Sequence, residues 1–184
     1  MSVVRSSLLC ALVLVTAVVA CSEGKNSMAP RSQQEAVNIP MSNTTGSGTV
    51  STPLGRATFS DPNDQNFNVK RITGDWQMQI KAKPAFDIAV QTIDFKKDAQ
   101  SGWHSHPGPV FIQVTLGTMT FYESDDPTCS PIVRTAGQGY LDLGEHAHIA
   151  RNESGLPAQT LVTYFVPPGA ALKSDADRPG NCPF

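Results

Sequence analysis

Apolar and polar residues alternate with a period of two along most of the chain after residue 69. In residues 86–95, FDIAVQTIDF, the alternation is interrupted by one slip, which a bulge would explain. Shorter segments of the same kind follow, and most are bounded by Gly, Pro, Asp or Ser clusters: VFIQVTLG, TMTFYES, GYLDLG and QTLVTYFVPPG. No segment shows a convincing helical stripe. The pattern predicts short strands in an all-β antiparallel sandwich or barrel.

The same alternation assigns individual side chains to the two faces of the predicted sheet. It places Val110, Ile112 and Val114 inside the barrel and the residues between them outside. Trp103 has the opposite parity to the histidines beside it and is expected to pack on the outer face. The segment TLGTMTFYES predicts two strands joined at Gly117 in a tight hairpin.

The N-terminus differs in composition from this domain. Residues 1–20 have a short polar start with one Arg and then an apolar run that is short for a spanning helix and typical of a secretory signal peptide. The run ends in VVAC, which resembles the lipobox of bacterial lipoproteins. That resemblance implies cleavage before Cys21, a lipid on its thiol, and no spanning helix. The alternative is an ordinary signal peptide cut after Ala20, with Cys21 incidental.

Residues 21–52 hold few large apolar residues and many Ser, Thr, Asn, Gly and Pro. Such a composition cannot bury enough surface to offset chain entropy, so we expect a flexible linker there and a single folded domain at 53–184. We therefore expect an exported protein, lipid-anchored to a bacterial membrane. Ser22, which follows the cysteine, resembles lipoproteins sorted to the outer membrane, so the domain would face the periplasm in a cell with two membranes.

The chain has four cysteines. If Cys10 is removed with the signal peptide and Cys21 is acylated, Cys129 and Cys182 remain, and outside the cytosol they are expected to form a disulfide. This bond would attach the irregular C-terminal tail to the domain. The alternative, a metal or redox site of two cysteines, lacks CxxC spacing and a nearby histidine.

The formal net charge is −2, and no cluster of Lys and Arg stands out. Nucleic-acid binding therefore has no electrostatic footprint in this chain.

All four histidines lie in two His-x-His pairs, at 104 and 106 and at 146 and 148. Positions i and i+2 of a strand project to the same face, so each pair can direct two imidazoles at one point. Neutral imidazole is a ligand for Fe, Zn, Ni, Cu and Mn. The arrangement predicts a metal site, against the alternative of ordinary core or surface histidines.

These histidines lie in two segments that resemble the two motifs of the cupin superfamily, over residues 70–167. The first motif is matched by His104 and His106, three residues, position 110, six residues and Gly117. The second is matched by His148, three residues and Asn152, with Gly144 one residue out of register. The resemblance implies a double-stranded β-helix, which is an antiparallel jelly-roll barrel. It also implies a possible homodimer, because cupins often form dimers.

The resemblance also implies a ligand set. His104, His106 and His148 match the three metal-binding histidines, whereas the usual glutamate falls on Val110, which cannot coordinate a metal. A three-histidine site leaves positions open for water or substrate. Three-histidine iron sites occur among cupin-like dioxygenases, so iron is the first expectation for the metal, with Zn, Ni, Cu or Mn as alternatives.

The function implied is binding of one divalent transition metal, with dioxygenase chemistry on a small, partly apolar organic molecule as the leading activity. A metal-assisted isomerase or lyase, with His146 or Glu145 as proton carrier, is a second reading. We expect His146 to contact a metal ligand or to lie at the rim of the site, ahead of the alternatives that it binds the metal itself or carries a proton. The rival from another class is a non-catalytic module that binds or senses a metal or a small ligand.

Overall fold

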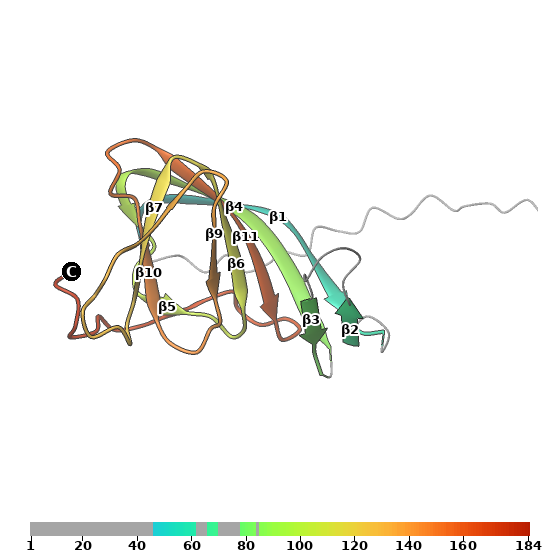
Figure 1. Ribbon diagram of the computed structural model, residues 1–184. Helices are drawn as coiled ribbons and strands as arrows, with labels where there is room; N and C mark the ends of the chain where they lie inside the picture. The colour runs from blue at the N-terminus through green and yellow to red at the C-terminus, as the bar shows by residue number, and fades with distance from the viewer. Residues whose placement is uncertain (1–45, 62–65, 70–77, 84) are drawn as a thin grey trace, which may run out of the picture. The chain divides into compact units, whose positions relative to one another are not determined.

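The computed structural model describes residues 46–61, 66–69, 78–83 and 85–184 (Figure 1). The predicted signal peptide, Cys21 and most of the predicted linker lie outside these residues. The described part of the chain contains strands and no helix, so it offers no helix that could cross a membrane.

Ten of the strands form two antiparallel layers. The first layer has the order β1 (Ser47–Phe59), β4 (Phe86–Gln100), β11 (Ala158–Val166), β6 (Val110–Leu116) and β9 (Gly139–Asp142). The second has the order β12 (Ser174–Asp175), β5 (His104–Ser105), β10 (His148–Arg151), β7 (Thr118–Glu123) and β8 (Ile132–Thr135). The layers are joined where Arg151 pairs with Gln100. Two further strands, β2 (Asn66–Val69) and β3 (Met78–Lys81), pair with each other.

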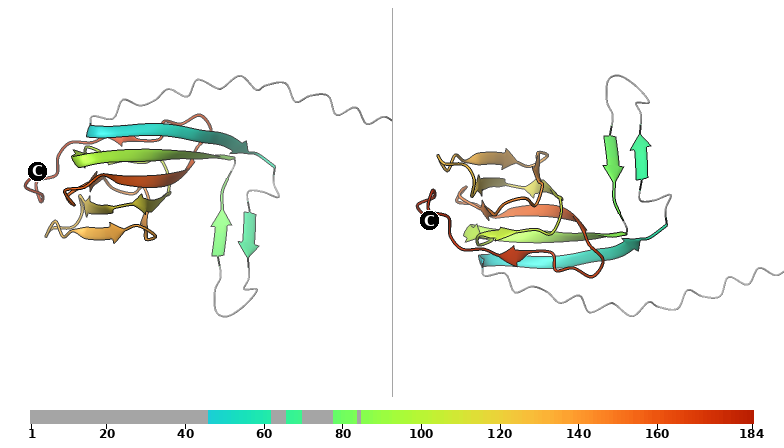
Figure 2. Two further views of the ribbon diagram at one scale, coloured as in Figure 1. Left: turned by 90° about the horizontal axis from the view of Figure 1, so that it is seen from above. Right: turned by 90° about the horizontal axis from the view of Figure 1, so that it is seen from below.

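Consecutive strands mostly alternate between the two layers, as β4, β5, β6 and β7 do (Figures 1 and 2). This order is that of a double-stranded β-helix, and the two layers make a nearly closed antiparallel barrel. The predicted all-β jelly-roll barrel is confirmed.

The predicted hairpin at Gly117 is wrong. The two strands on either side exist, but β6 pairs with β11 and β9, whereas β7 pairs with β10 and β8. Gly117 has a φ of 73°, and a Cβ there would lie 2.7 Å from the carbonyl oxygen of Pro157. The glycine therefore forms a corner at which the chain passes from one layer to the other, because only a residue without Cβ fits this backbone.

The inward positions of β6 were predicted correctly. Val110, Ile112 and Val114 are buried in the main core, whereas Gln113 is exposed. The interior between the layers is therefore largely apolar around the histidines.

Trp103 packs outside this interior. It belongs to a second cluster with Tyr122, Ile149 and Cys182, and its Nε1 donates a hydrogen bond to the carbonyl of Phe184 (3.2 Å). The expected outer-face position of Trp103 is confirmed, and the C-terminal tail covers this face. The tail is attached by the predicted disulfide between Cys129 and Cys182, whose Cα atoms are 5.3 Å apart.

The folded part begins earlier than predicted. Strand β1 starts at Ser47 and pairs with β4, although residues 47–52 belong to the segment predicted as linker. An edge strand is held by backbone hydrogen bonds, so small polar residues can form it without burying much surface.

Candidate metal centre

Three histidines meet inside the barrel, brought together by neighbouring strands of the second layer. His104 on β5 and His148 on β10 are paired directly in register. His106 follows one residue after β5, at the start of the turn that leads to β6. The exposed fractions of the three residues are 6%, 6% and 1% in chain order. The structure therefore brings together the three histidines that the cupin resemblance selected.

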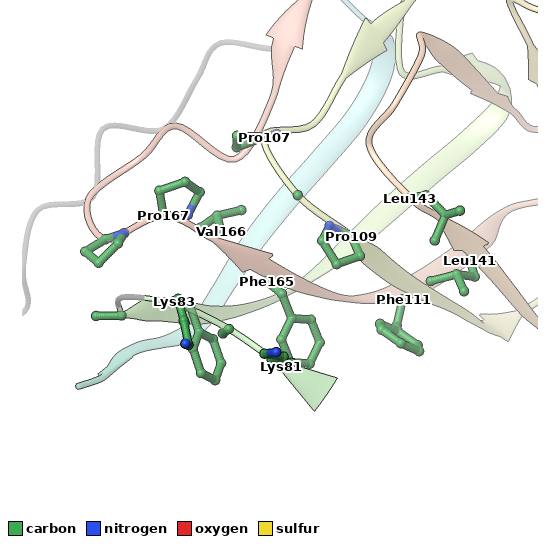
Figure 3. Close-up of a pocket in the computed structure, with 15 residues that line it drawn as sticks. Lys81, Lys83, Pro107, Pro109, Phe111, Leu141, Leu143, Phe165, Val166 and Pro167 are labelled. Atoms are coloured by element: carbon green, nitrogen blue, oxygen red, sulfur yellow. The ribbon is translucent and has the colours of Figure 1, made fainter. Parts of the chain in front are cut away.

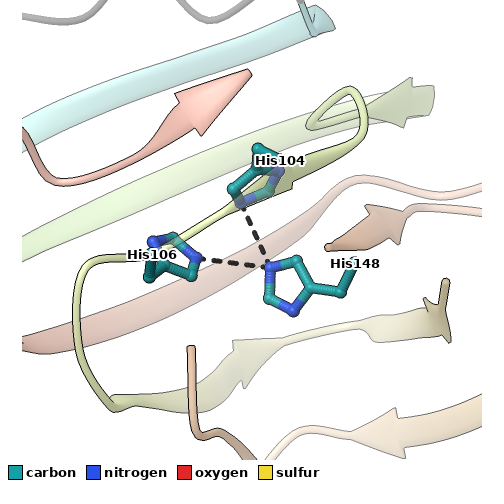
Figure 4. A group of neighbouring side chains, drawn as sticks. All are labelled: His104, His106 and His148. Carbon is teal, nitrogen blue, oxygen red and sulfur yellow. Dashed lines mark hydrogen bonds between the residues drawn. The ribbon is translucent and has the colours of Figure 1, made fainter. Parts of the chain in front are cut away.

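The three imidazoles point their Nε2 atoms at one another (Figure 4). His148 Nε2 lies 3.1 Å from His104 Nε2 and 3.3 Å from His106 Nε2. Two nitrogen ligands bound at ordinary length to one ion stand about 2.9–3.4 Å apart, depending on the angle between them. The spacing therefore fits a common metal ion.

The outer ring nitrogens of two histidines donate to backbone carbonyls. His104 Nδ1 lies 2.8 Å from the oxygen of Gly102, and His106 Nδ1 lies 2.7 Å from the oxygen of Leu172. A carbonyl can only accept, so both Nδ1 atoms carry the proton. In the neutral rings, Nε2 is then left with a lone pair that faces the interior.

His148 has a side-chain partner in the same role. Its Nδ1 lies 3.3 Å from the hydroxyl of Tyr140, and this hydroxyl donates its own proton to Glu123. The hydroxyl oxygen is therefore free to accept from Nδ1. All three rings adopt the tautomer that a metal requires, with the outer nitrogen held in the way typical of metal-binding histidines.

Burial keeps the three rings neutral. Desolvation, assisted by the neighbouring His106, lowers the pKa of His104 from the usual 6.5 to about 3. Desolvation also lowers the pKa of His106 and that of His148. Metal ions bind unprotonated imidazole, so the cluster is ready for a metal at neutral pH without first losing protons.

Position 110 holds no ligand, because the fully buried side chain of Val110 ends in methyl groups. Asp142 is a carboxylate close to the histidines that motif spacing did not select. It is 3% exposed, and its Oδ2 lies 3.0 Å from His148 Nδ1 and 3.7 Å from His106 Nε2. Its only sequence signal was its place in the second motif, where a proline was expected.

The two residues considered as proton carriers lie away from the cluster. His146 Nε2 contacts Glu123 Oε2 at 2.9 Å and Asp125 Oδ1 at 3.3 Å, at the rim of the barrel. Glu145 is exposed on the preceding turn. Asn152 is fully buried and fixes the loop after β10, because its side-chain nitrogen donates to the carbonyl of Leu156 at 2.6 Å.

The space beside the histidines is small. The cavity that they line has a volume of about 30 Å³, roughly enough for one water molecule. A larger cavity of about 630 Å³ has an apolar lining that includes Phe111 and Phe165, and none of the three histidines (Figure 3). The roomy cavity and the metal-binding side chains are therefore separate.

No family model matches the sequence, and no curated protein matches it. Among solved structures, the chain is similar to a cupin-like protein from Thermotoga maritima (18% identity, 48% of this chain and 64% of the other, TM-score 0.43). It is also similar to a double-stranded β-helix protein from Klebsiella pneumoniae (17%, 50% and 76%, TM-score 0.42). A third is a polyketide cyclase from Streptomyces resistomycificus (14%, 64% and 65%, TM-score 0.42). These neighbours include a cupin-like protein and a protein with a double-stranded β-helix domain.

The buried histidines predict an acid-sensitive fold. Because the pKa of His104 is about 3 in the folded chain and near 6.5 when unfolded, the unfolded chain binds more protons between these pH values. The free energy of unfolding of the metal-free protein should therefore fall as pH drops below 6.5, by up to about 1.4 kcal/mol per pH unit for each such histidine. Between pH 7.5 and 4.5, the free energy of unfolding measured with denaturant should fall less steeply with decreasing pH in His104→Asn than in the unaltered chain. Parallel curves for both proteins would contradict this assignment.

Proposed function

We propose that this chain binds one divalent transition-metal ion through Nε2 of His104, His106 and His148. The observation that carries the proposal is that every outer nitrogen has an acceptor, while the inner nitrogens of His104 and His106 lie 3.1 Å and 3.3 Å from that of His148. Without a cation, these lone pairs would repel one another. Imidazole donors suit Fe, Zn, Ni and Cu, and we place iron first.

Metal content of the purified chain tests this proposal. We expect about one ion per chain after incubation with Fe²⁺ or Zn²⁺ and removal of excess metal, measured by plasma mass spectrometry. His104→Ala and His148→Ala should each abolish stoichiometric binding. His146→Ala is the matched control, since its imidazole faces Glu123 and Asp125 at the rim, and it should retain the ion. Equal metal content in all four proteins would refute the site.

We propose a metal-binding module as the first role and an oxygenase as the second. The cavity of about 30 Å³ favours the module, because it leaves no room for an organic substrate beside the ion. The dioxygenase reading is supported by the neutral donors, which leave positions open for further ligands and let the ion act as a Lewis acid. The isomerase or lyase reading has less support, since His146 and Glu145 lie away from the cluster.

Oxygen consumption separates the two roles. The iron-loaded chain, assayed with an oxygen electrode against a panel of small organic metabolites, should show no substrate-dependent uptake if it is a module. Uptake that depends on one compound and disappears in His148→Ala would establish the dioxygenase in its place.

We further propose that the chain is exported and lipid-anchored through Cys21. The Cys129–Cys182 disulfide supports export, because such bonds persist in oxidising compartments. A small-molecule ligand and a homodimer remain predictions.

Mass spectrometry of the protein from a bacterial membrane fraction tests the anchor. The mature chain should begin at Cys21 and carry the added mass of a lipidated cysteine, and Cys21→Ser should lose that mass and the membrane association. An unmodified Cys21 on a processed chain would indicate an ordinary signal peptide.

A further inference from the structure

A row of apolar side chains crosses the outer face of the first layer. Phe86 on β4, Phe165 on β11 and Phe111 on β6 lie side by side, with ring centroids 6.1 Å apart in the first pair and 5.5 Å apart in the second. Leu141 on β9 is paired directly with Phe111, so it continues the row to the last strand of the layer. Phe111 alternates along β6 with the inward Val110, and none of the four belongs to a buried cluster of the described residues. The row therefore lies outside the interior that holds the histidines.

These four residues line the cavity of about 630 Å³ (Figure 3). Its volume lies within the range of about 300–1,000 Å³ that is usual for the sites of small organic molecules. The wall also includes four prolines, Pro107, Pro109, Pro167 and Pro168. Because a proline ring fixes the backbone φ, this part of the wall is stiff. At the far side, Leu143 is 56% exposed. Apolar surface in contact with water is unfavourable, so the cavity suits an apolar occupant.

Two exposed lysines, Lys81 and Lys83, bring charge to this cavity. All other described residues of the lining are apolar or glycine, so the lining carries positive charge and no negative charge. Within the described ranges, neither ammonium is paired with a carboxylate. Figure 3 shows the lysines at one end of the cavity and Leu141 and Leu143 at the other. Ammonium groups beside a wall of low dielectric attract an anion, so one end suits an acidic group and the rest suits a hydrocarbon body.

We propose that this cavity binds a small apolar organic anion, whose hydrocarbon body lies on Phe165 and Phe111 and whose acidic group lies at Lys81 and Lys83. A free fatty acid of medium chain length has this chemistry. A membrane or a second copy of the chain presents a broad surface, whereas a concave site of this volume is filled by a small molecule. The lining includes none of the three histidines, so this site is separate from the metal centre and does not depend on it.

Isothermal titration of the purified chain with decanoate tests the site, and 1-decanol is the uncharged comparison of the same chain length. We expect one saturable site that binds decanoate more tightly than decanol. The advantage of decanoate should shrink as the salt concentration rises, because the attraction between exposed charges is screened. The affinity for decanol should change little with salt.

Variants at the two ends of the cavity separate its two contributions. Lys81→Gln combined with Lys83→Gln should lower the affinity for decanoate roughly fivefold and leave that for decanol unchanged, since each exposed charge pair contributes modestly. Lys96→Gln combined with Lys97→Gln is the matched control, because it removes the same charge from exposed positions of β4 outside the lining, and it should change neither affinity.

Leu143→Asp alters the apolar end at an exposed position and should weaken both ligands at least roughly threefold. Thermal unfolding of each variant checks that the fold is kept.

Several outcomes would overturn this assignment. Decanoate that shows no saturable binding, or that binds the two double variants equally well, would remove the site. A dimer that Leu143→Asp dissociates, in a chain that does not bind decanoate, would make this face a contact between copies. Binding to vesicles of anionic lipid without binding of free decanoate would make it a membrane contact.

Discussion

The hydrogen bonds of the outer ring nitrogens connect the backbone of this barrel to the chemistry of its interior. His104 donates to the carbonyl of Gly102, which lies just before β5. His106 donates to the carbonyl of Leu172, in the segment that precedes β12. Each bond fixes both the rotation of a ring and the nitrogen that carries its proton. The lone pairs that His104 and His106 direct toward His148 depend on these bonds. If either ring turned over, it would no longer present its unprotonated Nε2 to the interior.

The rest of the fold holds these partners in place. Strand β12 pairs with β5, so the carbonyl of Leu172, two residues before β12, is held close to the strand that carries His104. Farther along, the tail covers Trp103 and is joined to the loop after β7 by the disulfide of Cys129. Tyr140 holds the outer nitrogen of His148 through its hydroxyl, and its own ring is stacked on that of Phe121 with ring centroids 4.1 Å apart. Packing and metal chemistry therefore share residues.

Alternation along the chain was sufficient to predict the strands, the inward position of Val110 and the common face of His104 and His106, because side-chain direction in a strand follows from position alone. It was not sufficient to predict which strands pair. The hairpin at Gly117 was wrong for that reason, since a glycine between two strands suits both a hairpin and a corner between layers. Composition also placed residues 47–52 in a linker, although they pair with β4 as part of β1.

The partners of the histidines could not have been found from motif spacing. A backbone carbonyl such as that of Leu172 has no sequence signature, and Asp142 is recognisable only once β9 is known to lie beside β6. The contacts of His106 with Leu172 and with Asp142 link residues far apart in the sequence, so they depend on the register of the barrel. What the sequence shows of this centre is its histidines, and the features that prepare them for a metal appear only in the folded chain.

X-ray absorption at the edge of the bound metal tests the central claim most directly. A chain loaded with one equivalent of Fe²⁺ or Zn²⁺ should give a first shell at about 2.0–2.2 Å and the outer-shell scattering of three imidazole rings. The imidazole signal should fall to two rings in His104→Ala if any metal is retained. A first shell of oxygen atoms without imidazole scattering would contradict the account, because the metal would then lie elsewhere on the chain.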